Sequence, residues 1–233
     1  MTETYYDKFS EMTERPSLLL HSCCAPCSSY CLVYMRRWFD ITCLYYNPNI
    51  TNREEYEKRS AELCKLADVL NDDFVYVEDG RLIVSSFKPP FSYSPIKVIT
   101  CDFTPDIFTE EVERNNLQNC PERGERCSMC FSQRLAKTFE VACQNGFDYF
   151  ATTLTLSPLK NAEVINEIGN TISQKGNDLS AEAADNDEYP KWLYTDFKKK
   201  NGYKISIELS KRYDLYRQNY CGCEYSKRKI QDR

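Results

Sequence analysis

The amino-acid sequence predicts a single α/β domain with an open, mostly parallel Rossmann-like sheet flanked by helices. Two observations predict this fold: short apolar segments alternate with stretches of helical periodicity, and a Cys-rich turn links the first apolar segment to the first helix. The chain has 233 residues, of which 42% are hydrophobic, and this is enough to bury the core of one such domain. In an open parallel sheet the functional site lies beyond the carboxyl ends of the strands.

The expected strands are short apolar runs, and the expected helices carry apolar residues every three or four positions. The strands are expected at residues 18–20, 41–46, 74–77 and 147–152. The helices are expected at residues 28–38, 52–70 and 105–114, in a long segment that opens at Cys127, and at residues 161–169. The first strand, the first helix and the second strand form the βαβ unit with which a parallel sheet begins.

Local signals mark the boundaries of two of these helices. Glu55 follows Asn52 by three residues, which is the spacing of a capping box at the start of a helix. Phe131 and Leu135 share one face of the long helix, and Gly146 supplies its stop.

The chain is expected to form one domain with short additions. Residues 1–16 are a polar N-terminal extension, residues 17–226 the catalytic α/β domain, and residues 227–233 a basic C-terminal tail. Residues 87–95 carry three prolines and are expected to form a loop. Residues 171–189 lose apolar periodicity and are rich in polar residues, so we expect a solvent-exposed insertion there.

Composition narrows the class of protein. No apolar run approaches the roughly 18 residues that a membrane helix needs, and the acidic start of the chain does not resemble a secretory signal. We therefore expect a cytoplasmic protein without a membrane partner. The net charge of −5 gives no global basic field for a nucleic acid, so any such contact must use local patches. Lys198, Lys199 and Lys200 form one patch, although solvated surface charge is the alternative interpretation.

The thirteen cysteines carry the strongest functional signal. In a reducing compartment, this many cysteines predict metal ligands, redox groups and core residues rather than a disulfide framework. The first group is Cys23, Cys24 and Cys27, directly before a helix whose N-terminus stabilises thiolates. Vicinal cysteines suit two ligands to one centre, because they close on each other only with difficulty. Small buried residues in a turn are the alternative.

The second group is Cys127 and Cys130, a C-x-x-C at the start of the long helix. Its two sulfurs face the same side of the helix, and the motif fits zinc, an iron-sulfur cluster or a thiol redox pair. Together with Cys23 and Cys24 it makes a complete set of four thiolates, provided that the fold brings the two halves of the chain together.

The third group is Cys221-Gly222-Cys223, in which the glycine lets the backbone bend. A disulfide within this pair would be strained, which suits a bond that breaks and re-forms in turnover. Coordination of a second metal and an incidental pair are the alternatives.

The remaining cysteines and the single histidine are less informative. Cys43, Cys64 and Cys143 are expected to pack in the core, and Cys31 to support the first turn. Cys27 is kept as a possible further ligand, whereas Cys101 and Cys120 have no assigned role. His21 adjoins the first group and either orients a ligand, donates a proton or is a satisfied structural residue.

Six sequence blocks are spread over nearly the whole chain. They are LLLHSCCAPC, YNPNI, ERGERCSMCF, TTLTLSPLKN, DFKKKNGY and SIELSKRYDLYRQNYCGCEYS. In this order they closely resemble the QueH-type epoxyqueuosine reductases. Residues 171–189 are longer and more divergent than the family pattern.

The resemblance implies reduction of epoxyqueuosine to queuosine at the wobble position of tRNA, the final step of queuosine biosynthesis. It implies a 4Fe-4S cluster, with Cys23, Cys24, Cys127 and Cys130 as its ligands. It further implies that Cys221 and Cys223 form the redox-active pair. An additional mononuclear iron is implied near the cluster, for which Asp102 or Asp196 is a weaker candidate ligand. We hypothesise that an electron-poor iron polarises the epoxide oxygen as a Lewis acid.

The implied partners are a tRNA bearing epoxyqueuosine and an electron donor that the sequence does not identify. Lys198, Lys199 and Lys200 are the candidate tRNA contacts, because a basic patch can meet phosphates. Two alternatives stay open. An ATP-dependent tRNA-modifying enzyme is disfavoured because the turn HSCCAPCSS has no glycine to cradle a phosphate. A zinc-stabilised, non-catalytic RNA-binding protein would instead hold zinc at the four thiolates.

Overall fold

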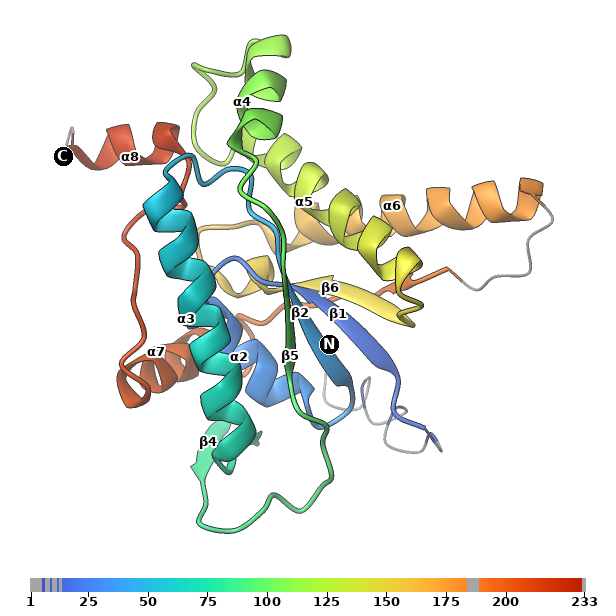
Figure 1. Cartoon of the computed structure of the whole chain (residues 1–233), viewed down its shortest axis with the longest axis vertical. Helices are drawn as coiled ribbons and strands as arrows, with labels where there is room; N and C mark the ends of the chain where they lie inside the picture. Colours follow the sequence, from blue (N-terminus) through green and yellow to red (C-terminus); the bar gives the residue numbers. More distant parts are fainter. Residues whose placement is uncertain (1–5, 7–8, 10–11, 13, 184–188, 232–233) are drawn as a thin grey trace.

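The computed structural model describes residues 6, 9, 12, 14–183 and 189–231. Its centre is a five-stranded sheet in the order β5-β2-β1-β6-β7, in which all paired strands run parallel. The strands are β1 (Ser17–His21), β2 (Asp40–Tyr45), β5 (Lys97–Thr100), β6 (Tyr149–Thr152) and β7 (Lys191–Trp192). The predicted Rossmann-like α/β fold is confirmed (Figure 1).

The strand order creates a switch point in the middle of the sheet. The chain moves outward from β1 through β2 to β5 and then returns to β6, which pairs with the other side of β1. At such a point the connections leave neighbouring strands in opposite directions, so a crevice opens at their carboxyl ends. The segments that follow β1 and β6 therefore border the expected site.

Helices cover both faces of the sheet. They are α2 (Ala25–Met35), α3 (Arg53–Asp72), α4 (Pro105–Arg114), α5 (Glu125–Gln144), α6 (Ala162–Ala183), α7 (Gly202–Arg212) and α8 (Glu224–Gln231). A 3-10 helix, η1 (Thr153–Leu156), follows β6 directly. Figure 1 shows α2, α3 and α7 on one side of the sheet and α5 and α6 on the other.

The alternation of side chains along β1 explains why two faces are covered. Leu18 and Leu20 belong to the core under α2, α3 and α7, whereas Leu19 packs under α5 with Phe150 and Ala142. Successive strand residues point to opposite faces, and burial of both faces requires the continuous apolar run seen in this strand.

The predicted boundary signals are confirmed. The Asn52 side chain accepts a hydrogen bond of 2.8 Å from Glu55 N, so it caps α3 as its sequence spacing predicts. Gly146 has a φ of +64° directly after α5, a conformation that a glycine adopts without the penalty of a Cβ atom.

The strand predicted at residues 74–77 exists, but the prediction that it belongs to the main sheet is wrong. The observed β3 (Val75–Glu78) pairs antiparallel with β4 (Arg81–Val84) and forms a separate two-stranded sheet. Asp79 and Gly80, both with positive φ, form the tight turn between the two strands. The third strand of the main sheet is instead β5, where no strand was predicted.

The helix predicted at residues 161–169 continues through much of the polar stretch. Ser173 ties α6 to β7, since its hydroxyl donates to Pro190 O at 3.1 Å and accepts from Trp192 N at 3.2 Å. Gly169 lies against the Trp192 ring and Gly176 against the Phe139 ring, which leaves no room for a larger side chain. These contacts pack α6 against Trp192 and Phe139 as far as Gly176, and the helix continues to Ala183. Residues 184–188 lie outside the described part of the chain.

Two residues of the predicted N-terminal extension, Tyr6 and Phe9, are buried and pack against Trp38 and Phe39. At the other end, α8 spans the start of the predicted basic tail. No helix in the described residues is both long and apolar enough to cross a membrane.

Candidate metal centre

One cavity of about 530 Å³ opens beyond the carboxyl ends of β1 and β6. We call it the thiol cavity, because six cysteines from three distant parts of the sequence line it. They are Cys23, Cys27, Cys127, Cys130, Cys221 and Cys223. The fold therefore gathers in one place the three cysteine motifs that the sequence singled out.

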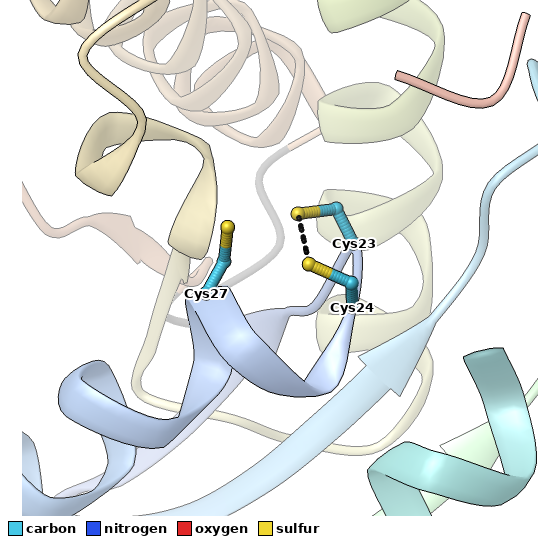
Figure 2. A group of neighbouring side chains, drawn as sticks. All are labelled: Cys23, Cys24 and Cys27. Atoms are coloured by element: carbon cyan, nitrogen blue, oxygen red, sulfur yellow. Dashed lines mark hydrogen bonds between the residues drawn. The ribbon is translucent and has the colours of Figure 1, made fainter. Parts of the chain in front are cut away.

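The first turn holds its three thiols close together. The sulfurs of Cys23, Cys24 and Cys27 all lie within 4.8 Å of one another, and the Cys23 and Cys24 sulfurs are 3.7 Å apart. Figure 2 shows the Cys23 and Cys24 side chains side by side, with a dashed line between their sulfurs, and Cys27 on the first turn of α2 beside them. Three soft donors at this separation can hold a metal ion.

Protonation in this group is uneven. Hydrogen bonds from Cys24 and Cys27 hold the pKa of Cys23 well below its usual range, although burial opposes this effect. The same coupling to Cys23 raises the pKa of Cys24 to about 12 and also raises that of Cys27. The three thiols thus differ in how readily they lose a proton, and metal binding favours their deprotonated forms.

Buried polar contacts fix the position of this turn. Asn47 Nδ2 donates to Ser22 O at 3.0 Å, and His21 Nε2 donates to Tyr46 O at 3.1 Å. Because a carbonyl oxygen only accepts, the proton of the neutral ring lies on Nε2, and Nδ1 accepts from Thr152 Oγ1 at 2.8 Å. Burial lowers the pKa of His21 to about 3. Both ring nitrogens of this buried histidine have partners in the protein, which favours the structural interpretation of His21.

The segment after β6 supports the turn from the other side of the switch point. Thr153 Oγ1 accepts a hydrogen bond of 3.4 Å from Cys23 N and lies 3.7 Å from Cys23 Sγ, to which it can donate. This contact gives the start of the TTLTLSPLKN block a direct role in positioning the first cysteine.

The C-x-x-C pair occupies the first turns of α5, which begins at Glu125, two residues before the predicted start. Arg123 N donates to Cys127 Sγ at 3.2 Å from a backbone with a φ of +70°. Burial raises the pKa of the Cys127 thiol above its usual value. Burial also raises the pKa of Cys130, to about 12. Both thiols face the thiol cavity, as the helical spacing predicted.

The C-x-C turn is held against the loop that follows β2. Gly222 has a φ of +113°, which confirms that the bend needs a glycine. Asn49 Nδ2 and Arg59 Nη1 each donate to Cys221 O at 3.3 Å. The YNPNI block therefore serves two cysteine motifs, with Asn47 tied to the first turn and Asn49 to this one.

All thirteen cysteines lie in the described part of the chain, and each is a free thiol. Cys31 and Cys43 are buried in the core, and Cys31 Sγ donates to Cys27 O at 3.2 Å. Cys64, Cys101, Cys120 and Cys143 are partly exposed and do not line the thiol cavity.

Comparison with known proteins identifies the family. The sequence matches the family described as Epoxyqueuosine reductase QueH over residues 18–229. The chain belongs to this family. A relative of that description from Streptococcus pyogenes serotype M1 is 38% identical, and the match covers 91% of this chain and 71% of the relative. Another from Staphylococcus epidermidis is 37% identical, and the match covers 91% of this chain and 77% of the relative. One from Thermotoga maritima is 31% identical over 90% of each chain.

Membership of the QueH family confirms the resemblance inferred from the six sequence blocks. Its members are named as reductases, so this chain is an oxidoreductase. This result disfavours both the ATP-dependent enzyme and the non-catalytic RNA-binding protein.

Two cationic residues of the thiol cavity in this QueH family member, Arg134 and Lys160, were not predicted from the sequence. Arg134 is 1% exposed and lines the thiol cavity, as does Lys160 of the TTLTLSPLKN block. Burial lowers the pKa of Lys160, but the sulfurs of two cysteine motifs outweigh it and hold the pKa above its usual range. The sequence does indicate that Arg134 is buried, because this residue shares a helical face with Phe131 and Leu135, where a charge is unusual. It does not indicate that Arg134 lies beside the cysteines.

Other predicted site residues lie outside the thiol cavity. Asp102 is exposed just after β5, and Asp196 lies 3.5 Å from Lys198 Nζ and 3.9 Å from Lys199 Nζ. Lys198 Nζ also donates to Thr155 O at 3.4 Å and to Lys160 O at 3.3 Å. Neither aspartate and none of the residues Lys198, Lys199 and Lys200 lines the cavity. Their roles as iron ligands and tRNA contacts stay predictions.

Proposed function

We propose that this protein reduces epoxyqueuosine to queuosine in tRNA, using an iron-sulfur cluster and the cysteine pair Cys221 and Cys223. The observation that carries the proposal is the meeting of three cysteine motifs in one cavity of a QueH family member. Cys23, Cys24, Cys127 and Cys130 would hold the 4Fe-4S cluster.

The residues of the thiol cavity fit such a group. Thiols are the ligands that iron-sulfur clusters use. Cys23, Cys127 and Cys130 line the cavity, and Cys24 is buried and does not line it, but its sulfur lies 3.7 Å from that of Cys23. A ligated cluster is anionic, and the cavity offers a buried cation, Arg134, whose Nη2 atom has no hydrogen-bond partner among the described residues. Cys27 lines the cavity beside Cys23 and supplies a further thiol for an additional iron.

The reaction requires two electrons and two protons. The carbon–oxygen bonds of the epoxide break, an alkene forms between the two carbons, and the oxygen leaves as water. Oxidation of the Cys221 and Cys223 thiols to a disulfide releases two electrons and two protons, which balances this change. The disulfide must be reduced again before the next turnover, and the cluster, when bound, would relay the electrons of the donor one at a time for that reduction.

The mouth of the thiol cavity suits a nucleotide that is turned out of its stack. Leu159 is 59% exposed and Tyr203 is 40% exposed, and both line the cavity. Arg123 and Arg217, also exposed, line it as well and can meet phosphates. Anticodon loops present unstacked bases, which stack on aromatic rings, so we propose that the wobble nucleotide enters past Tyr203. A cytoplasmic location agrees with a tRNA substrate and with reduced thiols.

The test is mass spectrometry of nucleosides from epoxyqueuosine-containing tRNA incubated with the anaerobically reduced enzyme. We expect queuosine to appear with the wild-type protein, and the Cys221→Ser and Cys223→Ser variants to lose activity. The Cys143→Ser variant is the matched control, because Cys143 lies outside the cavity, and it should retain activity. Unchanged epoxyqueuosine with an iron-loaded wild-type enzyme would refute the proposal.

A further inference from the structure

The guanidinium of Arg134 is charged and has an aromatic neighbour, the Phe131 ring of the same helix, whose centroid lies 5.6 Å from the Cζ atom. Its Nε donates to Cys130 O at 3.2 Å, and Nη2 is buried without a hydrogen bond. No carboxylate among the described residues forms an ion pair with it. A buried charge left uncompensated costs several kcal/mol, so a folded protein keeps one only where something neutralises it.

The other buried arginines are used differently. Arg59 lies 2.6 Å from Glu55, and its guanidinium also reaches the backbone before Gly222. Arg36 donates to Leu70 O at 2.7 Å and also to Val75 O. Arg126 donates to three carbonyls of the loop before it. The terminal nitrogens of these three arginines hydrogen-bond to other segments of the protein. The terminal nitrogens of Arg134 make no such bond among the described residues.

Arg134 lines the thiol cavity together with cysteines of all three motifs. Burial lowers the pKa of Arg134, but the negative charge that nearby sulfurs carry when ionised raises the pKa above the usual value. The sulfurs concerned belong to Cys130, Cys221, Cys23 and Cys127. The orphaned cation therefore lies where the proposed cluster would bring its negative charge.

We propose that Arg134 is a positioning residue, the internal counter-cation that retains the thiolate-ligated iron-sulfur centre and raises its reduction potential. The inference rests on the proposed function. Reduction adds negative charge to a centre that is already anionic, and a cation in a water-poor site stabilises the more negative form. In the metal-free protein no carboxylate among the described residues neutralises this buried charge, so there we expect it to cost stability.

The experiment compares three variants of the full chain with the wild type after anaerobic reconstitution. Arg134→Met removes the charge at similar volume, and Arg134→Lys keeps a charge but loses the planar fork. Lys137→Met is the matched control, because it removes a cation from the exposed side of the same helix, where Lys137 pairs with Glu140. The measurements are iron and sulfide per chain, the midpoint potential from an EPR-monitored redox titration, and the melting temperature of each metal-free protein.

We expect Arg134→Met to lose most of its cluster or to shift the midpoint to a more negative value. Arg134→Lys should lie between it and the wild type, and Lys137→Met should match the wild type. Metal-free Arg134→Met should melt no lower than the metal-free wild type, since it loses an unpaired buried charge. Wild-type iron content and midpoint in Arg134→Met would overturn the inference, as would a large fall in its metal-free melting temperature. A wild-type protein that binds no iron would instead overturn the proposed function itself.

Discussion

Replacement of Gly222 by alanine tests whether the C-x-C turn is built as the structure describes. At a φ of +113° an alanine is strained by about 1–3 kcal/mol. Its Cβ atom would also lie 2.6 Å from Ile50 Cγ1, whereas carbon atoms pack at about 3.5–4.0 Å. The turn must therefore move by about 1 Å or force Ile50 aside, which adds about 1–3 kcal/mol of overpacking. We expect a total loss of about 3 kcal/mol in the free energy of unfolding.

Gly146→Ala is the matched control, because Gly146 also has a positive φ, +64°, but no atom lies within 4 Å of the Cβ that alanine would add. It should lose only about 1 kcal/mol, from backbone strain alone. A shift of about 1 Å in the two thiols should cost Gly222→Ala roughly 100-fold in kcat/KM. The assays are urea unfolding and the rate of queuosine formation. Equal free energies of unfolding and equal activities in the two variants would refute the inference that the C-x-C turn has no room for a Cβ atom at position 222.

Three further perturbations probe other parts of the molecule. Glu55→Ala leaves the buried Arg59 without its carboxylate at 2.6 Å, so urea unfolding should report a loss of about 3 kcal/mol; no loss would mean that water already serves this cation. Gly169→Ala should lower the melting temperature, because the new Cβ would lie 2.3 Å from the Trp192 ring. This clash should outweigh the preference of alanine for a helix, which is about 1 kcal/mol, and a rise in the melting temperature would contradict the packing of α6. Replacing residues Lys198–Lys200 with alanine should weaken tRNA binding and flatten its salt dependence in an anisotropy titration, and an unchanged slope would remove them from the interface.

The parts of the fold that sequence predicted are those with strong local signals. The capping box at Asn52 depends on residues a few positions apart, and so does the stop at Gly146. The cysteine spacing likewise reports local geometry. These features are written in short stretches of chain, so no knowledge of the tertiary structure was needed.

The errors arise where tertiary packing decides. The polar residues after position 170 stay helical because Trp192 and Phe139 pack against the glycines of α6. The strand β5 is short and half exposed, so it shows little apolar pattern. The pairing of β3 with β4 was nevertheless predictable, since Asp79-Gly80 between two apolar runs is a common hairpin signal.

The candidate site divides in the same way. Its cysteines were visible because their type and spacing carry the chemistry. The contacts that position them, such as Asn49 and Arg59 on the C-x-C turn, join residues more than a hundred positions apart. Arg134 and Lys160 were missed because only the folded chain brings them beside the thiols.

The central claim is that sulfurs from separate parts of the chain hold iron together in the thiol cavity. Its most direct test is iron and acid-labile sulfide analysis of the anaerobically purified protein, for the wild type and for Cys23→Ser, Cys130→Ser and Cys143→Ser. We expect about four iron and four sulfide per wild-type chain, with any additional iron beyond that, and the same in the Cys143→Ser control. The cluster should be lost in both of the other variants, as the central claim requires. A colourless wild-type protein that holds zinc without sulfide, or a Cys130→Ser variant with its full cluster, would contradict it.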